Sequence, residues 1–399
     1  MEFSPFQKLI DETSRQLHEL EDVAVDNLRH IVAPYRICPL GAHVDHQGGP
    51  VLGRTINAYS VLAFYSLPGR QVRLQSANYP GPVNFSFDQI EPTQASDWGR
   101  YARGAAWALG RRYQIHHGFA GLIAGSLPGG GLSSSASAGL AYLYALAMAN
   151  DLSLSPADLI ELDRQLENDY LGLNNGILDQ ATIVHGSRHS FIYIDTRGES
   201  VIFVDDPSQA EEVRFLIAYS GISRELTKTS YNDRVTECHQ AARQLGRLAG
   251  RKDAKRLSDI PPEVFETYRH KLPPALQCRA AHYFGEVGRV ERGRRAWHDG
   301  EMKAFGALMN ESCYSSIHQY ESGSEPLKKL QEIVSGAPGV YGSRFSGGGY
   351  GGCVVGLVEM DAVSEAIEWI EDRYRAAYPQ LSESARCFVT RAEGGLRLQ

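Results

Sequence analysis

The sequence predicts an α+β protein with two domains. The chain has 399 residues, more than one hydrophobic core usually supports. Short strand-like apolar segments and longer amphipathic segments occur in both halves. Two glycine-rich loops lie more than 200 residues apart, which suggests a site assembled where two domains meet. We place the boundary near residue 195, which gives domains 1–195 and 196–399.

The first half is predicted to mix helices with strands. In chain order we expect one or two amphipathic helices within 3–30, strands at 32–40, 51–67 and 71–78, a helix at 98–113, a buried strand at 119–128 and a helix at 134–149. Another helix begins after Ser155, because Ser155 suits the N-cap, Pro156 the first helical position and Asp158 a capping-box variant.

The second half begins with short strands and continues with long helices. The expected elements are strands at 190–195, 200–205 and 213–220, helices at 231–249, 275–299 and 301–314, a strand, glycine loop and strand over 340–358, a helix at 362–378 and a last strand at 385–393.

The composition excludes several classes of protein. A net charge of -7 argues against a nucleic-acid partner. No apolar run is long enough to span a bilayer, and the N-terminal segment has no signal-peptide pattern. None of the six cysteines forms a C-x-x-C pair, so neither a zinc site nor a disulfide framework is indicated. Reduced cysteines favour a cytoplasmic location.

The segment PGGGLSSSASAGLAYLYAL (128–146) is the strongest functional signal. Successive glycines let the backbone approach a ligand, and the helix that follows directs its positive end at the same place. This is anion-binding chemistry that suits a nucleotide triphosphate. The alternative is a flexible turn with an ordinary serine cap, which would need one hydroxyl and no glycine triplet. The expected nucleotide-binding residues are Gly129, Gly130, Gly131, Leu132, Ser133, Ser134, Ser135 and Ala136.

A second glycine-rich loop, SGGGYGGC (346–353), contains Gly347, Gly348 and Gly349. It lies between two strand-like segments, so by itself it is equally consistent with a strained hairpin.

Two acids are further candidates. Glu167 lies at the edge of a buried helix face, and Asp179 follows Ile-Leu after a turn. Such acids could hold Mg²⁺ or accept a proton from a hydroxyl, although a lone helical glutamate is usually solvated.

These segments together resemble the GHMP kinase superfamily, and in particular its galactokinase-like branch. The stretch APYRICPLGAHVDHQGG (33–49) is similar to the galactokinase sugar signature, GGGLSSSAS to the phosphate loop and SGGGYGGC to the third motif. The resemblance covers nearly the whole chain, and it is strongest to plant-type galacturonokinases. It implies an N-terminal domain like ribosomal protein S5, a ferredoxin-like C-terminal domain and an active site in the cleft.

The resemblance also implies roles for individual residues. Asp179 would face the anomeric hydroxyl and deprotonate it, and Arg36 would pair with Asp179 beside the transferring phosphoryl group. Ser135 or a neighbouring serine would hold Mg²⁺ together with Glu167. The implied sugar contacts are Arg36, Ala42, His43, Asp45, Gly176, Asp179 and Tyr231.

Position 42 departs from the galactokinase pattern, which has a glutamate there for the C6 hydroxyl of galactose. A galacturonate carboxylate at C6 would be repelled by that glutamate, by about 1 kcal/mol at 4 Å in water and by more in a drier site. Ala42 removes this repulsion and makes room. We therefore expect an ATP- and Mg²⁺-dependent kinase for the anomeric hydroxyl of D-galacturonate, active as a monomer or weak homo-oligomer. The alternatives are a galactokinase, or a sensor that binds ATP and sugar without turnover.

Overall fold

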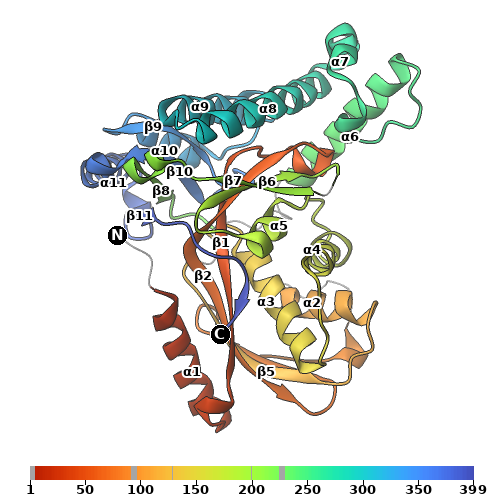
Figure 1. Cartoon of the computed structure of the whole chain (residues 1–399), viewed down its shortest axis with the longest axis vertical. Helices are drawn as coiled ribbons and strands as arrows, with labels where there is room; N and C mark the ends of the chain where they lie inside the picture. Colours follow the sequence, from red (N-terminus) through yellow and green to blue (C-terminus); the bar gives the residue numbers. More distant parts are fainter. Residues whose placement is uncertain (1–4, 91–96, 128, 199, 224–229) are drawn as a thin grey trace.

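Two β-sheets organise the chain. The computed structural model describes residues 5–90, 97–127, 129–198, 200–223 and 230–399. Figure 1 shows the long strands β1 and β2 running down the middle of the molecule, with helices α8 and α9 across its top.

The larger sheet has eight strands, in the order β12-β1-β2-β5-β3-β4, and β6 joins it by pairing with both β2 and β7. Among the pairings formed by the described residues, only that of β3 with β5 is parallel. Its strands are β1 (Arg29–Leu40), β2 (Val51–Leu67), β3 (Gln71–Ser76), β4 (Val83–Ser86), β5 (Gly118–Gly125), β6 (Ser190–Asp195), β7 (Ser200–Asp205) and β12 (Arg397–Leu398).

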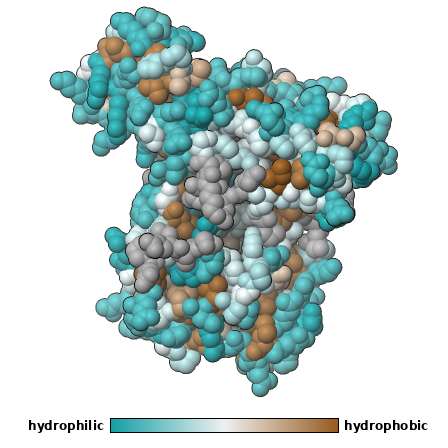
Figure 2. Space-filling view, turned by 180° about the vertical axis from the view of Figure 1, so that it is seen from behind, coloured by the Kyte–Doolittle hydropathy of each residue, from teal (hydrophilic) through white to brown (hydrophobic). Residues whose placement is uncertain are grey.

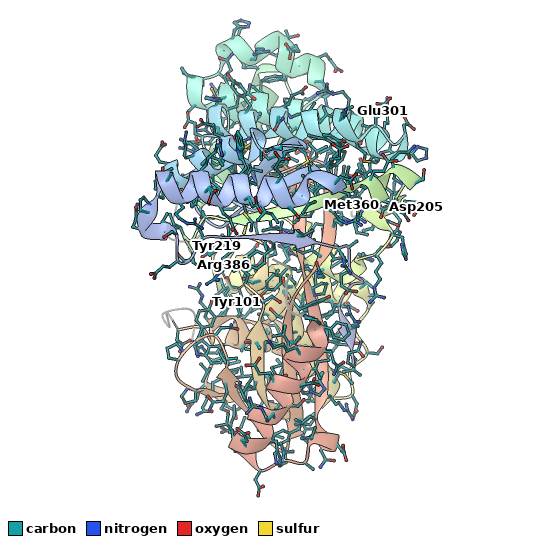
Figure 3. All side chains as sticks on the ribbon, turned by 90° about the vertical axis from the view of Figure 1, so that its left-hand side faces the viewer. Tyr101, Asp205, Tyr219, Glu301, Met360 and Arg386 are labelled. Carbon is teal, nitrogen blue, oxygen red and sulfur yellow. The ribbon has the colours of Figure 1, made fainter. Side chains whose placement is uncertain are left out.

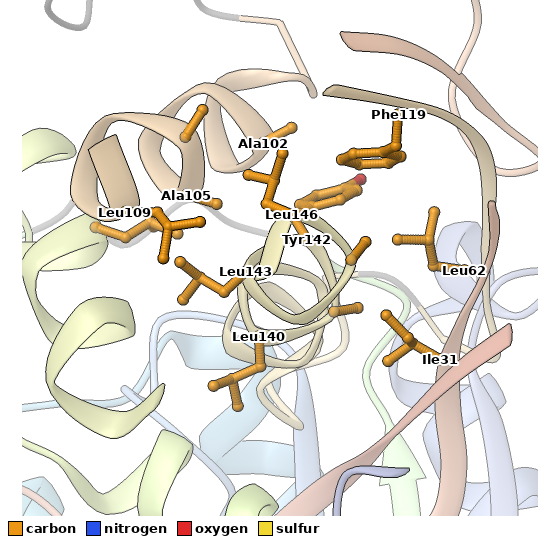
Figure 4. Close-up of a cluster of buried hydrophobic side chains, with 14 of the residues drawn as sticks. Ile31, Leu62, Ala102, Ala105, Leu109, Phe119, Leu140, Tyr142, Leu143 and Leu146 are labelled. Carbon is orange, nitrogen blue, oxygen red and sulfur yellow. The ribbon is translucent and has the colours of Figure 1, made fainter. Parts of the chain in front are cut away.

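Helices cover both faces of the larger sheet, because alternate residues of a strand point to opposite sides. Val32 of β1 packs on Leu9 of α1 (Phe6–Glu21), whereas its neighbour Ile31 packs in the cluster formed with α2 (Arg100–Gly110) and α3 (Ser134–Ala149). The helix α3 is apolar around most of its circumference, so it is buried in the centre of this cluster (Figure 4). Two more helices, α4 (Pro156–Gln165) and α5 (Leu178–His185), flank it.

The smaller sheet is antiparallel, in the order β11-β8-β10-β9. Its strands are β8 (Val213–Tyr219), β9 (Val340–Phe345), β10 (Cys353–Glu359) and β11 (Arg386–Thr390). One face packs on α10 (Glu325–Ser335) and α11 (Val363–Ala377), and Figure 3 shows α11 lying across the outside of this sheet. The other face shares a core with β1 and with α9 (Met302–His318), so the two sheets are joined by a common hydrophobic cluster.

Three further helices complete the fold: α6 (Tyr231–Leu248), α7 (Pro262–Tyr268) and α8 (Pro274–His298). Their apolar side chains bury Cys38, near the end of β1, and Val44, in the loop that follows β1. None of the helices in the described ranges is long and apolar enough to cross a membrane. The face in Figure 2 is mostly hydrophilic, with hydrophobic residues in small scattered groups.

The predicted mixture of helices and strands is confirmed, with local differences. The capping box at Ser155 is present, whereas the helical segment expected within 3–30 ends at Glu21 and gives way to β1 at Arg29. The sequence analysis missed β4, α5, α7, α10 and β12. The boundary near residue 195 stays a prediction. The strands on either side of it, β6 and β7, pair with each other, and the change of sheet comes between β7 and β8.

Candidate active site

A cavity of about 850 Å³ collects most of the residues predicted for the site. It opens among the loop after β1, the start of α3, the start of α5 and the glycine-rich turn between β9 and β10. Its lining includes Arg36, Ala42, His43, Asp45, Gly129, Gly131, Ser133, Ser134, Ser135, Glu167, Asp179, Tyr231, Gly347, Gly348 and Gly349. The remaining predicted residues, Gly130, Leu132, Ala136 and Gly176, are outside the lining but next to it in the chain or in space.

An ion pair between Arg36 and Asp179 forms part of this cavity lining. Arg36 projects from β1, and Asp179 stands in the first turn of α5. The guanidinium places Nε 2.8 Å and Nη2 2.7 Å from Oδ1 of Asp179, and the Ser133 hydroxyl donates to Oδ2. The arginine side chain is 4% exposed and the aspartate 20%. Both carboxylate oxygens are therefore held in place, while part of the carboxylate still faces the cavity.

The phosphate-loop serines do not act as an ordinary helix cap. Ser133 occupies the N-cap position of α3 with φ 60°, and its side chain makes no capping hydrogen bond. Its hydroxyl is used by Asp179 instead, and the Ser134 hydroxyl accepts from the Gly129 N–H at 3.0 Å. The positive end of α3 thus remains available for an anion in the cavity.

The two glycine-rich loops pack against each other, backbone on backbone. A Cβ on Gly347 would lie 2.9 Å from the Gly131 carbonyl oxygen, and one on Gly352 would lie 2.7 Å from the Gly130 carbonyl oxygen. Arg36 joins the loops, because Nη1 lies 3.4 Å from Ser346 Oγ and 3.5 Å from the Gly131 oxygen. The second loop is indeed a hairpin turn between β9 and β10, and its glycines also permit this close approach.

Glu167 is fully buried at the edge of the cavity, in a π-helical turn (Leu166–Tyr170) that continues α4. Its Oε2 accepts from the Asn175 amide at 2.5 Å. Burial, followed by the negative charge of Asp179, raises the pKa of Glu167 to about 8. A carboxylate in this position would gain from a nearby cation.

The donors around Glu167 suit a cation that arrives with a nucleotide. In the described part of the chain, no three acidic, histidine or cysteine side chains are grouped to hold a metal by themselves. Mg²⁺ is usually bound by one or two carboxylates together with substrate phosphates. Glu167 and the Ser135 hydroxyl at the start of α3 both line the cavity, beside the loop that suits a phosphate. The residues present therefore fit Mg²⁺ bound to ATP.

The sugar-signature residues form one wall of the cavity. His43 has φ 65° and stacks on Tyr320 with a centroid separation of 4.1 Å. Burial lowers the pKa of His43 well below its usual value, so its ring is neutral. Burial, together with the charge of Asp179, raises the pKa of Asp45 to about 6. One oxygen of Asp45 accepts from the Leu178 N–H at 3.3 Å, which ties this wall to α5.

Gly176 packs against the carboxylate of Asp45, although Gly176 itself does not line the cavity. A Cβ at Gly176 would lie 2.4 Å from Oδ2 of Asp45, so any side chain there would displace the carboxylate. Tyr231 begins α6 and is 5% exposed at the cavity wall.

Sequence reasoning missed a second, aromatic end of the cavity. Its lining includes Asn78, Tyr79, Trp98, Tyr101 and Tyr142. Trp98 and Tyr101 belong to the helix expected at 98–113, for which the sequence analysis gave no role in the site. Tyr101 lies in the lower half of the molecule in Figure 3.

Known proteins match the chain along nearly its whole length. Residues 100–187 match the GHMP kinases N terminal domain, and residues 294–376 match the GHMP kinases C terminal domain. The galacturonokinase of Arabidopsis thaliana is 42% identical over 378 residues, which are 90% of this chain and 89% of the relative. The galactokinase of Levilactobacillus brevis is 32% identical over 342 residues, 84% of this chain and 87% of the relative.

Solved structures agree with these sequence matches. The crystal structure of Lactococcus lactis galactokinase complexed with galactose superposes with a TM-score of 0.88, at 29% identity, over 96% of this chain and 98% of the other. A crystal structure of mevalonate kinase has a TM-score of 0.60 at 17% identity, over 91% and 98% of the two chains, and so shares the fold. The chain belongs to the GHMP kinases.

Proposed function

We propose that this chain is an ATP-dependent sugar-1-kinase that converts D-galacturonate into D-galacturonate 1-phosphate. The observation that carries the kinase assignment is the Arg36–Asp179 pair, held at the cavity wall beside two packed glycine-rich loops. Ala42 in the same cavity carries the choice of a sugar acid.

The proposed chemistry follows from the placement of the pair. Asp179 accepts the proton of the anomeric hydroxyl, and the sugar oxygen bonds to the γ-phosphorus while the bond to the β-phosphate oxygen breaks and ADP leaves. Arg36 holds Asp179 through the ion pair and lies close enough to the phosphate loop to stabilise charge on the phosphoryl group. The loop Gly129–Ala136 binds the phosphates at the start of α3, with backbone N–H groups from Gly131 onward as the donors.

We assign the cation to Glu167 and Ser135. Mg²⁺ bound there would neutralise charge on the β- and γ-phosphates. We assign the nucleotide base to the aromatic end of the cavity, where the rings of Tyr79, Trp98 and Tyr101 offer stacking surfaces.

The proposed substrate rests on the wall around Ala42. Ala42 presents only a methyl group, where a glutamate would place a negative charge against a C6 carboxylate. The identity of 42% to a galacturonokinase supports the same choice. The second candidate is D-galactose, favoured by the structural similarity to a galactokinase that was crystallised with that sugar. A non-catalytic sensor is the third, and the intact Arg36–Asp179 pair argues against it.

We further propose a cytoplasmic enzyme that works as a monomer or weak homo-oligomer on ATP and a small sugar acid, without nucleic-acid or membrane partners. All six cysteines are unpaired in the structure, which supports a reducing location.

A substrate panel tests the proposed function. Purified protein with Mg-ATP would be given galacturonate, galactose, glucuronate or glucose, and ADP formation would be followed with time. Phosphorus and carbon NMR of the product would locate the phosphate. We expect galacturonate to be the best substrate, with the phosphate on C1. Fastest turnover of galactose would favour a galactokinase, and binding of ATP and sugar without ADP release would favour a sensor.

A further inference from the structure

The backbone on both sides of Ala42 is held by one helix from the second half of the chain. Glu286 of α8 accepts a hydrogen bond from the Gly41 N–H to Oε1 at 2.8 Å. His282, one turn earlier on the same helix, places Nε2 3.0 Å from the Ala42 carbonyl oxygen. Residues four apart on a helix face the same side, so both side chains reach the loop together. These two hydrogen bonds are independent of the Ala42 side chain, because on the side of the loop they involve only main-chain atoms.

The hydrogen bonds define the state of His282. A carbonyl oxygen only accepts, so Nε2 must carry the proton, and Nδ1 lies 2.8 Å from the Ser315 hydroxyl oxygen, which also lies 2.6 Å from Oε1 of Gln319. His282 is 0% exposed, and burial lowers its pKa to about 4. A neutral ring with a fixed tautomer is therefore aimed at the Ala42 carbonyl.

Glu286 is ionised although it is completely buried. Burial by itself would raise its pKa, but the positive charges of Arg289 and Arg344 outweigh this effect and lower the pKa to about 2. Arg289 Nε lies 2.7 Å from Oε2, and the Ser312 hydroxyl lies 2.5 Å from Oε1. These partners fix the position of the Glu286 carboxylate, and the fixed Oε1 atom in turn holds the Gly41 N–H.

Glu286 also links the two loops of the active site. Arg344 of β9 lies 3.4 Å from the same Oε1 atom and two residues before Ser346, which opens the second glycine-rich loop. The Ser346 hydroxyl in turn lies 3.4 Å from Arg36. Glu286 therefore contacts both the loop after β1 and, through Arg344, the strand β9 that leads into the second glycine-rich loop. Of these two segments, His282 contacts only the loop after β1.

The loop needs this support because its backbone is unusual. Gly41 has φ 99°, and a Cβ there would lie 2.6 Å from the Val51 Cα. His43 has φ 65° without being a glycine, a left-handed conformation that L-residues adopt only at a cost. Such a conformation persists only where neighbouring groups fix it, and the contacts from α8 lie immediately before it in the chain.

We propose that His282 and Glu286 are positioning residues of the sugar site. By holding the Gly41 N–H and the Ala42 carbonyl, they set the loop so that Ala42 and His43 face the cavity, and they thereby govern sugar affinity more than phosphoryl transfer. Neither residue lines the cavity. The inference rests on the proposed function in one respect, namely that the sugar binds against the cavity wall that contains Ala42 and His43.

The test compares His282→Phe, which keeps a ring but loses the N–H donor, with His282→Gln, whose amide supplies a donor at a similar reach. For His282→Phe we expect the sugar KM to rise at least fivefold, with kcat and the KM for ATP within about twofold of wild type. His282→Gln should recover most of the sugar affinity. The control, His270→Phe on an exposed histidine near α8, should match wild type throughout. Glu286→Gln should raise the KM values of both sugar and ATP, because it also frees Arg344.

Sugar affinity would also be measured calorimetrically without ATP, so that binding is separated from turnover. An unchanged sugar KM and dissociation constant in His282→Phe, or equal losses in sugar and ATP affinity, would overturn the positioning role. If His282→Phe does not fold, Ser315→Ala decides, since it removes the hydrogen-bond partner of Nδ1. This variant should raise the sugar KM at least twofold, and no change would overturn the proposal. All variants are judged on whichever sugar the wild type uses, so a preference for galactose would refute the proposed substrate and leave this test intact.

Discussion

The guanidinium of Arg36 lies 2.8 Å from the carboxylate of Asp179, although the two residues are 143 positions apart in the chain. The strand β1 and the first turn of α5 bring them together, and Ser133 fixes the second carboxylate oxygen. Asp179 is thus held by a charge and a hydroxyl, an arrangement that suits the proton acceptor that we propose for this site.

Asp179→Asn should abolish most turnover while leaving ATP bound. The amide keeps the shape of the side chain but cannot accept the hydroxyl proton, so kcat should fall by about 10²–10⁴. Steady-state rates and nucleotide titrations on the same preparation would measure this. Asp253→Asn is the matched control, because Asp253 is exposed and lies outside the cavity lining. Near-normal kcat in Asp179→Asn would show that another group takes the proton.

Glu167→Gln should increase the Mg²⁺ concentration that gives half-maximal rate, since a neutral amide is a weaker ligand for a hard cation than a carboxylate. We expect a shift of at least about fivefold, measured by Mg²⁺ titration at saturating ATP and sugar. Glu368→Gln, on the exposed side of α11, should titrate as wild type does. A Mg²⁺ requirement unchanged by Glu167→Gln would remove this residue from the cation site.

The buried Glu167 should also make the stability of the metal-free protein depend on pH. Its pKa is raised from 4.5 to about 8 in the folded state. Between these two pH values the folded state therefore keeps a proton that the unfolded state has released. This contribution to stability is complete below about pH 4.5 and is lost as the pH rises through 8. Since one pKa unit corresponds to about 1.4 kcal/mol, the wild type should lose at least about 1 kcal/mol more than Glu167→Gln between pH 5.5 and 8. Urea unfolding at the two pH values would measure the difference, and parallel losses would contradict it.

Gly176→Ala should weaken sugar binding by pushing Asp45 away from the cavity wall. The new Cβ would lie 2.4 Å from Oδ2 of Asp45, which forces the carboxylate or the turn before α5 to move. We expect the sugar KM to rise at least fivefold. In the control Gly110→Ala, the added methyl group meets no atom within 4 Å, so kinetics should not change. A sugar KM for Gly176→Ala within twofold of wild type would show that the packing of Gly176 against Asp45 does not matter for sugar binding.

The sequence was informative where function depends on local pattern. The glycine triplet before an alanine-rich helix indicated an anion site because both features are contiguous, and α3 begins at Ser134 as expected. The strand, glycine loop and strand over 340–358 were also correct. Ala42 could be singled out because the galactokinase pattern that the surrounding residues resemble has a glutamate at this position.

Other features depend on contacts between distant segments and could not be predicted. The start of α5 near Asp179 carries no side-chain cap, so no local signal marks it. Glu167 looked like a solvated helix residue, yet a π-helical turn places it inside. The contacts of His282 and Glu286 with the loop after β1 span about 240 residues, and nothing in the periodicity of α8 indicates them.

The central claim is that Ala42 makes the site suitable for a sugar acid, and Ala42→Glu tests it most directly. The measurement is kcat/KM for galacturonate and for galactose, in wild type and in Ala42→Glu, under one set of conditions. We predict that the wild type prefers galacturonate, and that the variant loses at least about tenfold on galacturonate, or roughly 1.4 kcal/mol in the transition state, with a much smaller loss on galactose. Equal losses on the two sugars, or a wild type that prefers galactose, would contradict the account.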